Sequence, residues 1–145
     1  MRYLIAFVFV LGLMAVGVPR AAEPPLGVST SDVAAIRETI SRQIAAFRRD
    51  DGEAAFGLAT TGIRGTFQTA ENFMSMVRQG YPSVYRPREV EFRDLVALEG
   101  RIVQTVLVVG PDGKAMLAFY PMQRQPDGRW LTDGCWLVAV PEQTT

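Results

Sequence analysis

Histidine is absent from this sequence, and cysteine occurs only once, at Cys135. Without histidine, the chain cannot form a Ser-His-Asp triad, a Cys-His nucleophile pair or a histidine-ligated metal site. A single cysteine excludes an intrachain disulfide, and no cysteine near the N-terminus could carry a lipoprotein anchor. The sequence also contains no phosphate-binding glycine loop and no run of metal-ligating residues. We therefore expect no cofactor and no metal.

Neither sign of charge is in excess, since 15 basic side chains balance 15 acidic ones. No basic stripe is present, so nucleic acid is not an expected partner. The N-terminus combines Arg2 with an apolar run over residues 3–18, which is typical of an export signal. Ala22 suits the last removed position, although Arg20 stands where a small residue is preferred. The predicted organisation is a signal peptide at 1–22, a linker at 23–29, one α+β domain at 30–141 and a tail at 142–145.

Export predicts a periplasmic or secreted protein. Removal of Arg2 and Arg20 would leave 13 basic against 15 acidic side chains, a net charge of −2. The alternative is an uncleaved N-terminal anchor, because the apolar run is at the short end for a membrane-spanning helix. Only in that case do we expect contact with a membrane.

The C-terminal part of the chain predicts an antiparallel meander. Two similar turns, at 110–113 and 125–128, each place Pro, Asp and Gly in the order that short hairpin turns favour. The flanking segments are rich in β-branched, aromatic and aliphatic residues, as strands are. With an earlier alternating segment, the predicted strands cover 89–98, 102–109, 115–122 and 130–140.

The last of these strands has two apolar faces. Alternation places Trp130, Thr132, Trp136 and Val138 on one face, and Leu131, Asp133, Cys135 and Leu137 on the other. A sheet with one face in water should show polar residues on that face. We therefore expect helices to cover one face and a second subunit to cover the other, in a homodimer formed through the sheet.

The segment before the sheet predicts helices. Ser29 to Asp32 offer capping side chains, and apolar residues then recur at spacings of three and four, which form one helical face: Val33, Ile36, Ile40, Ile44 and Phe47. Asp51 is placed to cap a second helix, residues 63–67 favour one more turn, and Thr69 is placed to cap a third helix that ends just before Gly80. Pro82 and Pro87 should hold Tyr81 and Arg86 extended in a stiff joint.

Three helices followed by four strands resemble the nuclear-transport-factor-2-like, cystatin-like cone, in which helices pack on a curved four-stranded antiparallel sheet. More specifically, residues 31–140 resemble the family called domain of unknown function 4864. The motifs that carry this resemblance are 46–51, Ile63-Arg64 with Phe67, 73–77, Tyr81-Pro82 with 84–87, 110–113, and Asp127-Gly128 with Trp130 and Gly134-Cys135. The resemblance implies this fold class and no activity, since a cone of this kind can hold a ligand, a catalytic acid or nothing.

Asp133 is the one weak candidate for a catalytic residue. A carboxyl group in an apolar cleft has a raised pKa and can act as a general base, as in ketosteroid-isomerase-like members of the broader superfamily. The alternative is a structural aspartate bonded to nearby backbone beside Gly134. Cys135 fits a small buried hydrophobic residue better than a nucleophile, because no base is present to activate its thiol.

Five residues are candidates for ligand binding. Tyr81, Tyr85, Arg86 and Tyr120 could form a polar and aromatic rim, in which Arg86 pairs with a carboxylate or phosphate, with Cys135 in the pocket. The alternative is a rigid connector whose tyrosines cover the sheet edge.

We therefore expect an exported, non-enzymatic module that binds a small molecule or an envelope protein. An isomerase or dehydratase that uses Asp133 in the cone pocket is one alternative. A structural dimer that assists another envelope protein is the other.

Overall fold

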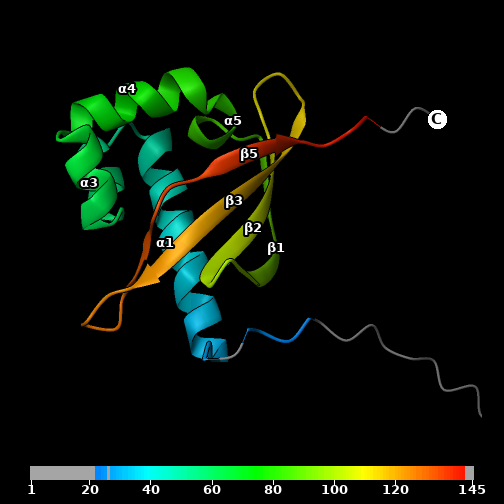
Figure 1. Ribbon diagram of the computed structural model, residues 1–145. Helices are drawn as coiled ribbons and strands as arrows, with labels where there is room; N and C mark the ends of the chain where they lie inside the picture. Colours follow the sequence, from blue (N-terminus) through cyan, green and yellow to red (C-terminus); the bar gives the residue numbers. More distant parts are fainter. Residues whose placement is uncertain (1–21, 26, 143–145) are drawn as a thin grey trace, which may run out of the picture.

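A computed structural model describes residues 22–25 and 27–142 (Figure 1). The predicted signal peptide, apart from Ala22, and the tail beyond Glu142 lie outside the described residues. The helices are α1 (Thr30–Arg48), α2 (Gly52–Gly57), α3 (Thr61–Phe67), α4 (Ala70–Gly80) and α5 (Pro82–Tyr85). The strands are β1 (Glu89–Leu98), β2 (Arg101–Val109), β3 (Ala115–Arg124), β4 (Trp130–Thr132) and β5 (Trp136–Ala139). The α+β class is confirmed.

The sheet is antiparallel and contains five strands rather than the predicted four. β1, β2 and β3 form the expected meander, and both β4 and β5 then pair with β3. The single strand predicted at 130–140 is interrupted because residues 133–135 lie opposite only Tyr120 and Pro121 of β3. Gly134 occupies this bulge with φ at +104°, a conformation that glycine adopts without strain.

This bulge makes the predicted faces of the last strand wrong. Trp130 pairs with Arg124 and Trp136 pairs with Phe119, so the two tryptophans lie on opposite faces of the sheet. One extra residue shifts the alternation by one position, which is why simple counting failed beyond Gly134. Trp130 is consequently buried under the helices, whereas Trp136 is exposed.

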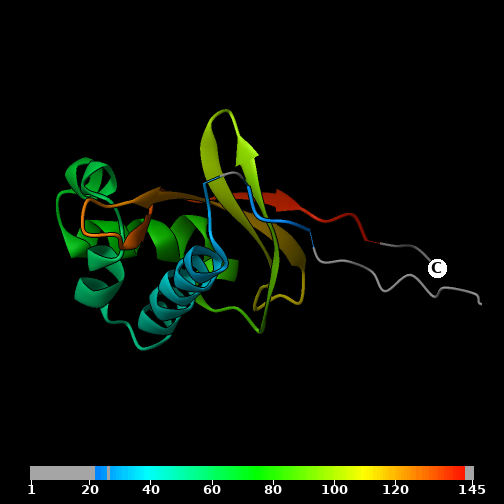
Figure 2. The same cartoon turned by 90° about the horizontal axis from the view of Figure 1, so that it is seen from below.

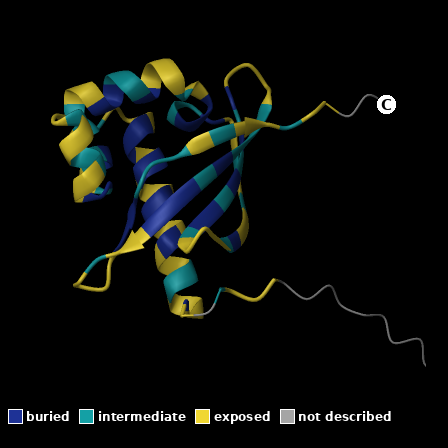
Figure 3. Ribbon diagram, viewed as in Figure 1, coloured by how far each residue is buried: buried dark blue, intermediate teal, exposed yellow. Residues whose placement is uncertain are grey.

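α1 lies across one face of the sheet, which we call the inner face (Figures 1 and 2). The predicted apolar stripe of α1 is buried at Ile36, Ile40, Ile44 and Phe47. These side chains share one core with inward-facing residues of β2 and β3, among them Val106. Figure 3 shows this buried centre, with exposed positions along β5 on the opposite face.

The smaller helices begin where capping residues occur. Asp51, Thr60 and Thr69 accept hydrogen bonds from the backbone of α2, α3 and α4. The predicted stiff joint instead contains the one-turn helix α5, because Pro82 fits the first position of a helix. Tyr81 and Arg86, which each precede a proline, lie just outside this turn. Gly80 is the last residue of α4 rather than the residue after it.

Asp32 joins the start of α1 to the sheet. Its carboxylate accepts hydrogen bonds from Ser29 N at 2.9 Å, from the Trp130 indole at 3.0 Å and from Arg124 at 2.6 Å. These bonds, led by that from the Ser29 backbone, lower the pKa of Asp32 from 3.8 to about 2. Because the folded-state pKa is depressed, Asp32 stabilises the fold above its unfolded pKa and this contribution disappears as pH falls through the folded pKa.

We therefore expect the free energy of unfolding to decrease between pH 3.8 and about 2. Asp32→Asn should flatten this part of the profile, although Asp50 and Asp127, whose pKa values are also lowered, will keep some slope. Urea denaturation at several pH values measures the effect. An identical slope in wild type and variant would contradict the assignment.

Candidate functional site

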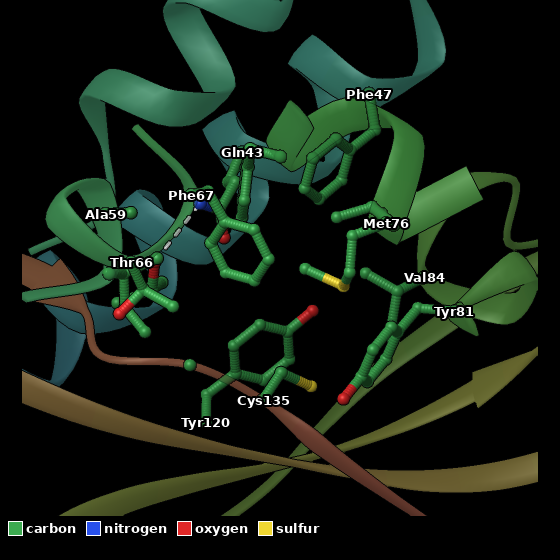
Figure 4. Close-up of a pocket in the computed structure, with 15 residues that line it drawn as sticks. Gln43, Phe47, Ala59, Thr66, Phe67, Met76, Tyr81, Val84, Tyr120 and Cys135 are labelled. Carbon is green, nitrogen blue, oxygen red and sulfur yellow. Dashed lines mark hydrogen bonds between the residues drawn. The ribbon is translucent and has the colours of Figure 1, made fainter. Parts of the chain in front are cut away.

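A cavity of about 450 Å³ lies between α1, α3, α4 and α5 on one side and the inner face of the sheet on the other (Figure 4). This volume falls within the range of small-molecule sites, roughly 300 to 1,000 Å³. Most of its wall is apolar, and among the described residues that line it none carries a charge. The apolar lining includes Phe47, Phe67, Phe73, Met76, Val77 and Val84.

Packed aromatic rings form one side of this wall. The Phe73 ring lies 6.0 Å from that of Phe47 and 5.7 Å from that of Phe67, measured between ring centroids. Phe73 also contacts Phe56 from α2, at 5.4 Å. Tilted and edge-on pairs of this kind add to the stability that burial alone provides. This side of the cavity is therefore shaped by the core itself.

The cavity reaches the surface along α3 and α4. Thr66 is exposed, and Ile63, Phe67, Met76 and Tyr81 are half-buried. The deeper lining residues, such as Tyr120, are buried. Gly134 and Cys135, on the strand side of the cavity, are also half-buried.

Tyr120 directs its hydroxyl into the cavity (Figure 4). The side chain is 1% exposed, and its oxygen has no hydrogen-bond partner among the described residues. The Cys135 thiol lies beside it, but a thiol is only a weak hydrogen-bonding group. Burial, followed by the neighbouring Cys135, raises the pKa of Tyr120 well above 10, so the phenol stays neutral.

The Cys135 thiol is held in its protonated form. Burial raises the pKa of Cys135 to about 12, and a thiol that remains protonated is a poor nucleophile. The thiol donates to the carbonyl oxygen of Trp136, at 3.8 Å. Cys135 therefore contributes a small, neutral surface to the cavity.

Gln43 is a second polar group of the cavity, and the sequence interpretation missed it. Its amide nitrogen donates to the Ala55 carbonyl at 3.0 Å. It also donates to the Thr132 hydroxyl at 3.1 Å (Figure 4). These bonds fix the orientation of the amide, and its oxygen accepts no hydrogen bond from a described residue. A glutamine between Ile40 and Phe47, on the apolar face of α1, was the signal available in the sequence.

The predicted rim residues separate into two groups. Tyr81, Tyr120 and Cys135 line the cavity, whereas Tyr85 and Arg86 do not. Arg86 donates to the Phe47 carbonyl and, at 3.0 Å, to Asp50 Oδ2, and its guanidinium lies 3.9 Å from the centroid of the Tyr85 ring. The Tyr85 hydroxyl also donates to Asp50. Both side chains thus fasten the C-terminal end of α1 to α5.

Asp133 lies beside the cavity without lining it. Its Oδ1 accepts a hydrogen bond from the Thr60 hydroxyl at 2.7 Å, and its Oδ2 pairs with Arg101 at 2.6 Å. The backbone N–H of Asp133 donates to Pro121, which closes the bulge. Each carboxylate oxygen therefore has a partner, and a role as general base remains a prediction without a geometric link to the cavity.

Within the described part of the chain, no group of three or more cysteine, aspartate or glutamate side chains is placed to hold a metal ion. None of the helices at 30–85 is both long and apolar enough to cross a bilayer.

Comparison with known proteins gives no match among curated proteins and none among solved structures. A family model described as "Domain of unknown function (DUF4864)" matches residues 29–145, which include every residue beyond the predicted linker. The chain therefore belongs to the DUF4864 family.

Proposed function

We propose that this protein is an exported, non-enzymatic binding module that takes up a small, largely apolar molecule in the cavity beneath α3 and α4. In this proposal, the helices and the sheet form a nuclear-transport-factor-2-like cone whose interior is the cavity. The observation that carries the proposal is a cavity of about 450 Å³ with an apolar, uncharged lining and a path to the surface. Enclosed apolar surface with few polar groups is typical of ligand sites.

A binding role is better supported than catalysis. General acid-base chemistry needs a titratable group within hydrogen-bond reach of the substrate. Tyr120 and Cys135 are the lining residues with the most obvious chemistry, and the pKa of each is raised by burial, so both stay protonated. Asp133 is engaged by Thr60 and Arg101 outside the lining. The isomerase alternative therefore has less support than ligand binding.

Titration with N-phenyl-1-naphthylamine tests the proposal, because this neutral fluorophore brightens in an apolar site. We expect saturable binding to wild type. Thr66→Trp should weaken it at least about tenfold, since an indole at the exposed mouth would occupy the entrance while disturbing little of the core. The matched control is Gln79→Trp, which places the same side chain on an exposed position of α4 outside the cavity lining. Absence of saturable binding to wild type would refute the proposal.

We also propose that a second copy of the chain covers the outer face of the sheet, which is the face opposite α1. Trp136 and Val138 are 40% and 47% exposed, and the register places both on that face. The Trp136 ring stacks on Phe119, with 5.2 Å between centroids. Leu98, which is 41% exposed, lies on the same face. Leu98 lies on β1, apart from the pair on β5, so the patch centres on Trp136, Val138 and Phe119, and an exposed apolar patch is typical of an interaction surface.

Native mass spectrometry of protein purified from the periplasm tests dimerisation and export together. We expect a dimer of chains that begin near Glu23, and Val138→Lys should convert it to a monomer because the lysine charge would be buried at the interface. Gln79→Lys, on α4, should leave the dimer intact. A wild-type monomer at micromolar concentration would contradict the dimer, and a chain that retains Met1 would contradict signal cleavage.

A further inference from the structure

Tyr120 is an exception to the way buried polar groups normally behave. The great majority of buried hydroxyl groups have a hydrogen-bond partner, because an unpaired one keeps its desolvation cost. Its hydroxyl has no partner among the described residues, although the side chain is only 1% exposed. The oxygen is directed toward the middle of the cavity (Figure 4). The space in front of the hydroxyl is therefore a place for a polar atom from outside the chain.

The protonation state determines what that atom can be. A neutral phenol has one O–H to donate, and Tyr120 stays neutral because burial raises its pKa well above 10. The phenol oxygen can also accept a hydrogen bond, but its O–H has no acceptor among the described residues, so an acceptor in front of it satisfies the unpaired donor. No charged residue lines the cavity among the described residues, so a carboxylate or ammonium group would lose its hydration without gaining an opposite charge. The complementary group is a neutral oxygen.

Gln43 supports the same conclusion from the opposite wall of the cavity. Its nitrogen is committed to Ala55 and Thr132, which holds the amide in one orientation. The oxygen that remains can accept a hydrogen bond but cannot donate one. Gln43 is 3% exposed, so its amide is also shielded from bulk water. The cavity therefore offers a donor at Tyr120 and an acceptor at Gln43 in a mostly apolar wall, in which Thr66, Tyr81 and Thr132 supply the other hydroxyl groups.

We infer that the cavity selects neutral apolar molecules that carry a carbonyl oxygen, and that the Tyr120 hydroxyl donates a hydrogen bond to this oxygen. The inference rests on the proposed function, since it assigns the ligand class of the same site. Apolar contacts with the phenylalanine wall supply most of the affinity. The Tyr120 bond distinguishes a ketone from a hydrocarbon of equal shape. Gln43 provides a place for a hydroxyl group on larger ligands of this class.

A matched pair of ligands tests the inference. 2-Acetylnaphthalene carries a ketone, and 2-isopropenylnaphthalene replaces that carbonyl with a methylene group of similar size. Each is titrated as a competitor of N-phenyl-1-naphthylamine against wild type and Tyr120→Phe. We expect Tyr120→Phe to weaken binding of the ketone about five- to tenfold, the value of a neutral hydrogen bond in a buried site. Binding of the hydrocarbon should be unchanged or slightly tighter.

Tyr85→Phe is the control, because it removes the same hydroxyl group from a tyrosine that does not line the cavity. It should leave the ratio of the two affinities within about twofold of wild type. A third ligand, 2-naphthoate, should bind at least about tenfold more weakly than the ketone because the site has no cation to pair with it. The thermal midpoint of Tyr120→Phe should equal or exceed that of wild type, which establishes that the variant is folded.

The possible failures are distinguishable. If the fluorophore and both naphthalenes bind, but Tyr120→Phe changes both affinities equally, the inference is overturned and the proposed function stands. If 2-naphthoate binds as tightly as the ketone, the exclusion of charged ligands is wrong. If none of the probes binds wild type, the proposed function fails and the inference fails with it.

Discussion

Replacing Arg86 with alanine should lower the free energy of unfolding by about 2 kcal/mol, a figure reduced for partial exposure of the side chain. The guanidinium bonds the Phe47 carbonyl at the end of α1, pairs with Asp50 and stacks on Tyr85. Arg86→Lys should recover only part of this stability, because an ammonium group cannot make the same set of planar contacts. Urea denaturation followed by tryptophan fluorescence measures the change.

Arg88→Ala is the matched control, since Arg88 is exposed in the same segment and makes no ion pair with a described residue. Its effect should stay within about 0.5 kcal/mol. Affinity for N-phenyl-1-naphthylamine should not change in Arg86→Ala, because Arg86 does not line the cavity. Loss of binding at unchanged stability would restore Arg86 as a ligand-binding residue.

Asp133→Ala should cost about 2 kcal/mol of stability. Its main effect is to leave the hydroxyl of Thr60, which is 1% exposed, without the acceptor that it now bonds at 2.7 Å. Loss of the pair with the half-exposed Arg101 should add little, since such surface pairs contribute at most about 1 kcal/mol. Asp133→Asn keeps an oxygen for Thr60 and should therefore cost less than about 1 kcal/mol.

Arg101→Met removes the ion pair alone. We expect it to lower the free energy of unfolding less than loss of the Thr60 bond does. Neither Asp133 variant should alter binding of N-phenyl-1-naphthylamine. Equal destabilisation by Asp133→Asn and Asp133→Ala would contradict the importance of the Thr60 bond. A turnover that disappears in Asp133→Asn while the fold stays intact would support the isomerase alternative instead.

Caps and turns were the parts of the fold that the sequence predicted well. Ser29 and Asp32, which were predicted to offer capping side chains, form a capping box, and β1 covers Glu89–Leu98 as expected. The Glu99-Gly100 turn follows, with both residues at positive φ. Each of these features depends on residues within a few positions of one another, so the local sequence contains the information that specifies them.

The candidate site was predicted only in part. Tyr120 and Cys135 were chosen for their chemistry and do line the cavity, as does Tyr81. Tyr85 and Arg86 have the same chemistry but face Asp50 instead. Chemical type could not separate these two groups, because the contact between Arg86 and Phe47 joins residues 39 positions apart.

By itself, the sequence determined the α+β class, the order of helices and strands and the DUF4864 family, because spacing, capping and turn chemistry act over short distances along the chain. The tertiary structure decided which residues meet. It placed a one-residue bulge at Gly134 that put Trp130 and Trp136 on opposite faces. It also left the Tyr120 hydroxyl unpaired in a cavity built from four helices and the sheet. The physical reason is that burial and hydrogen-bond satisfaction depend on packing between distant segments, which no local pattern encodes.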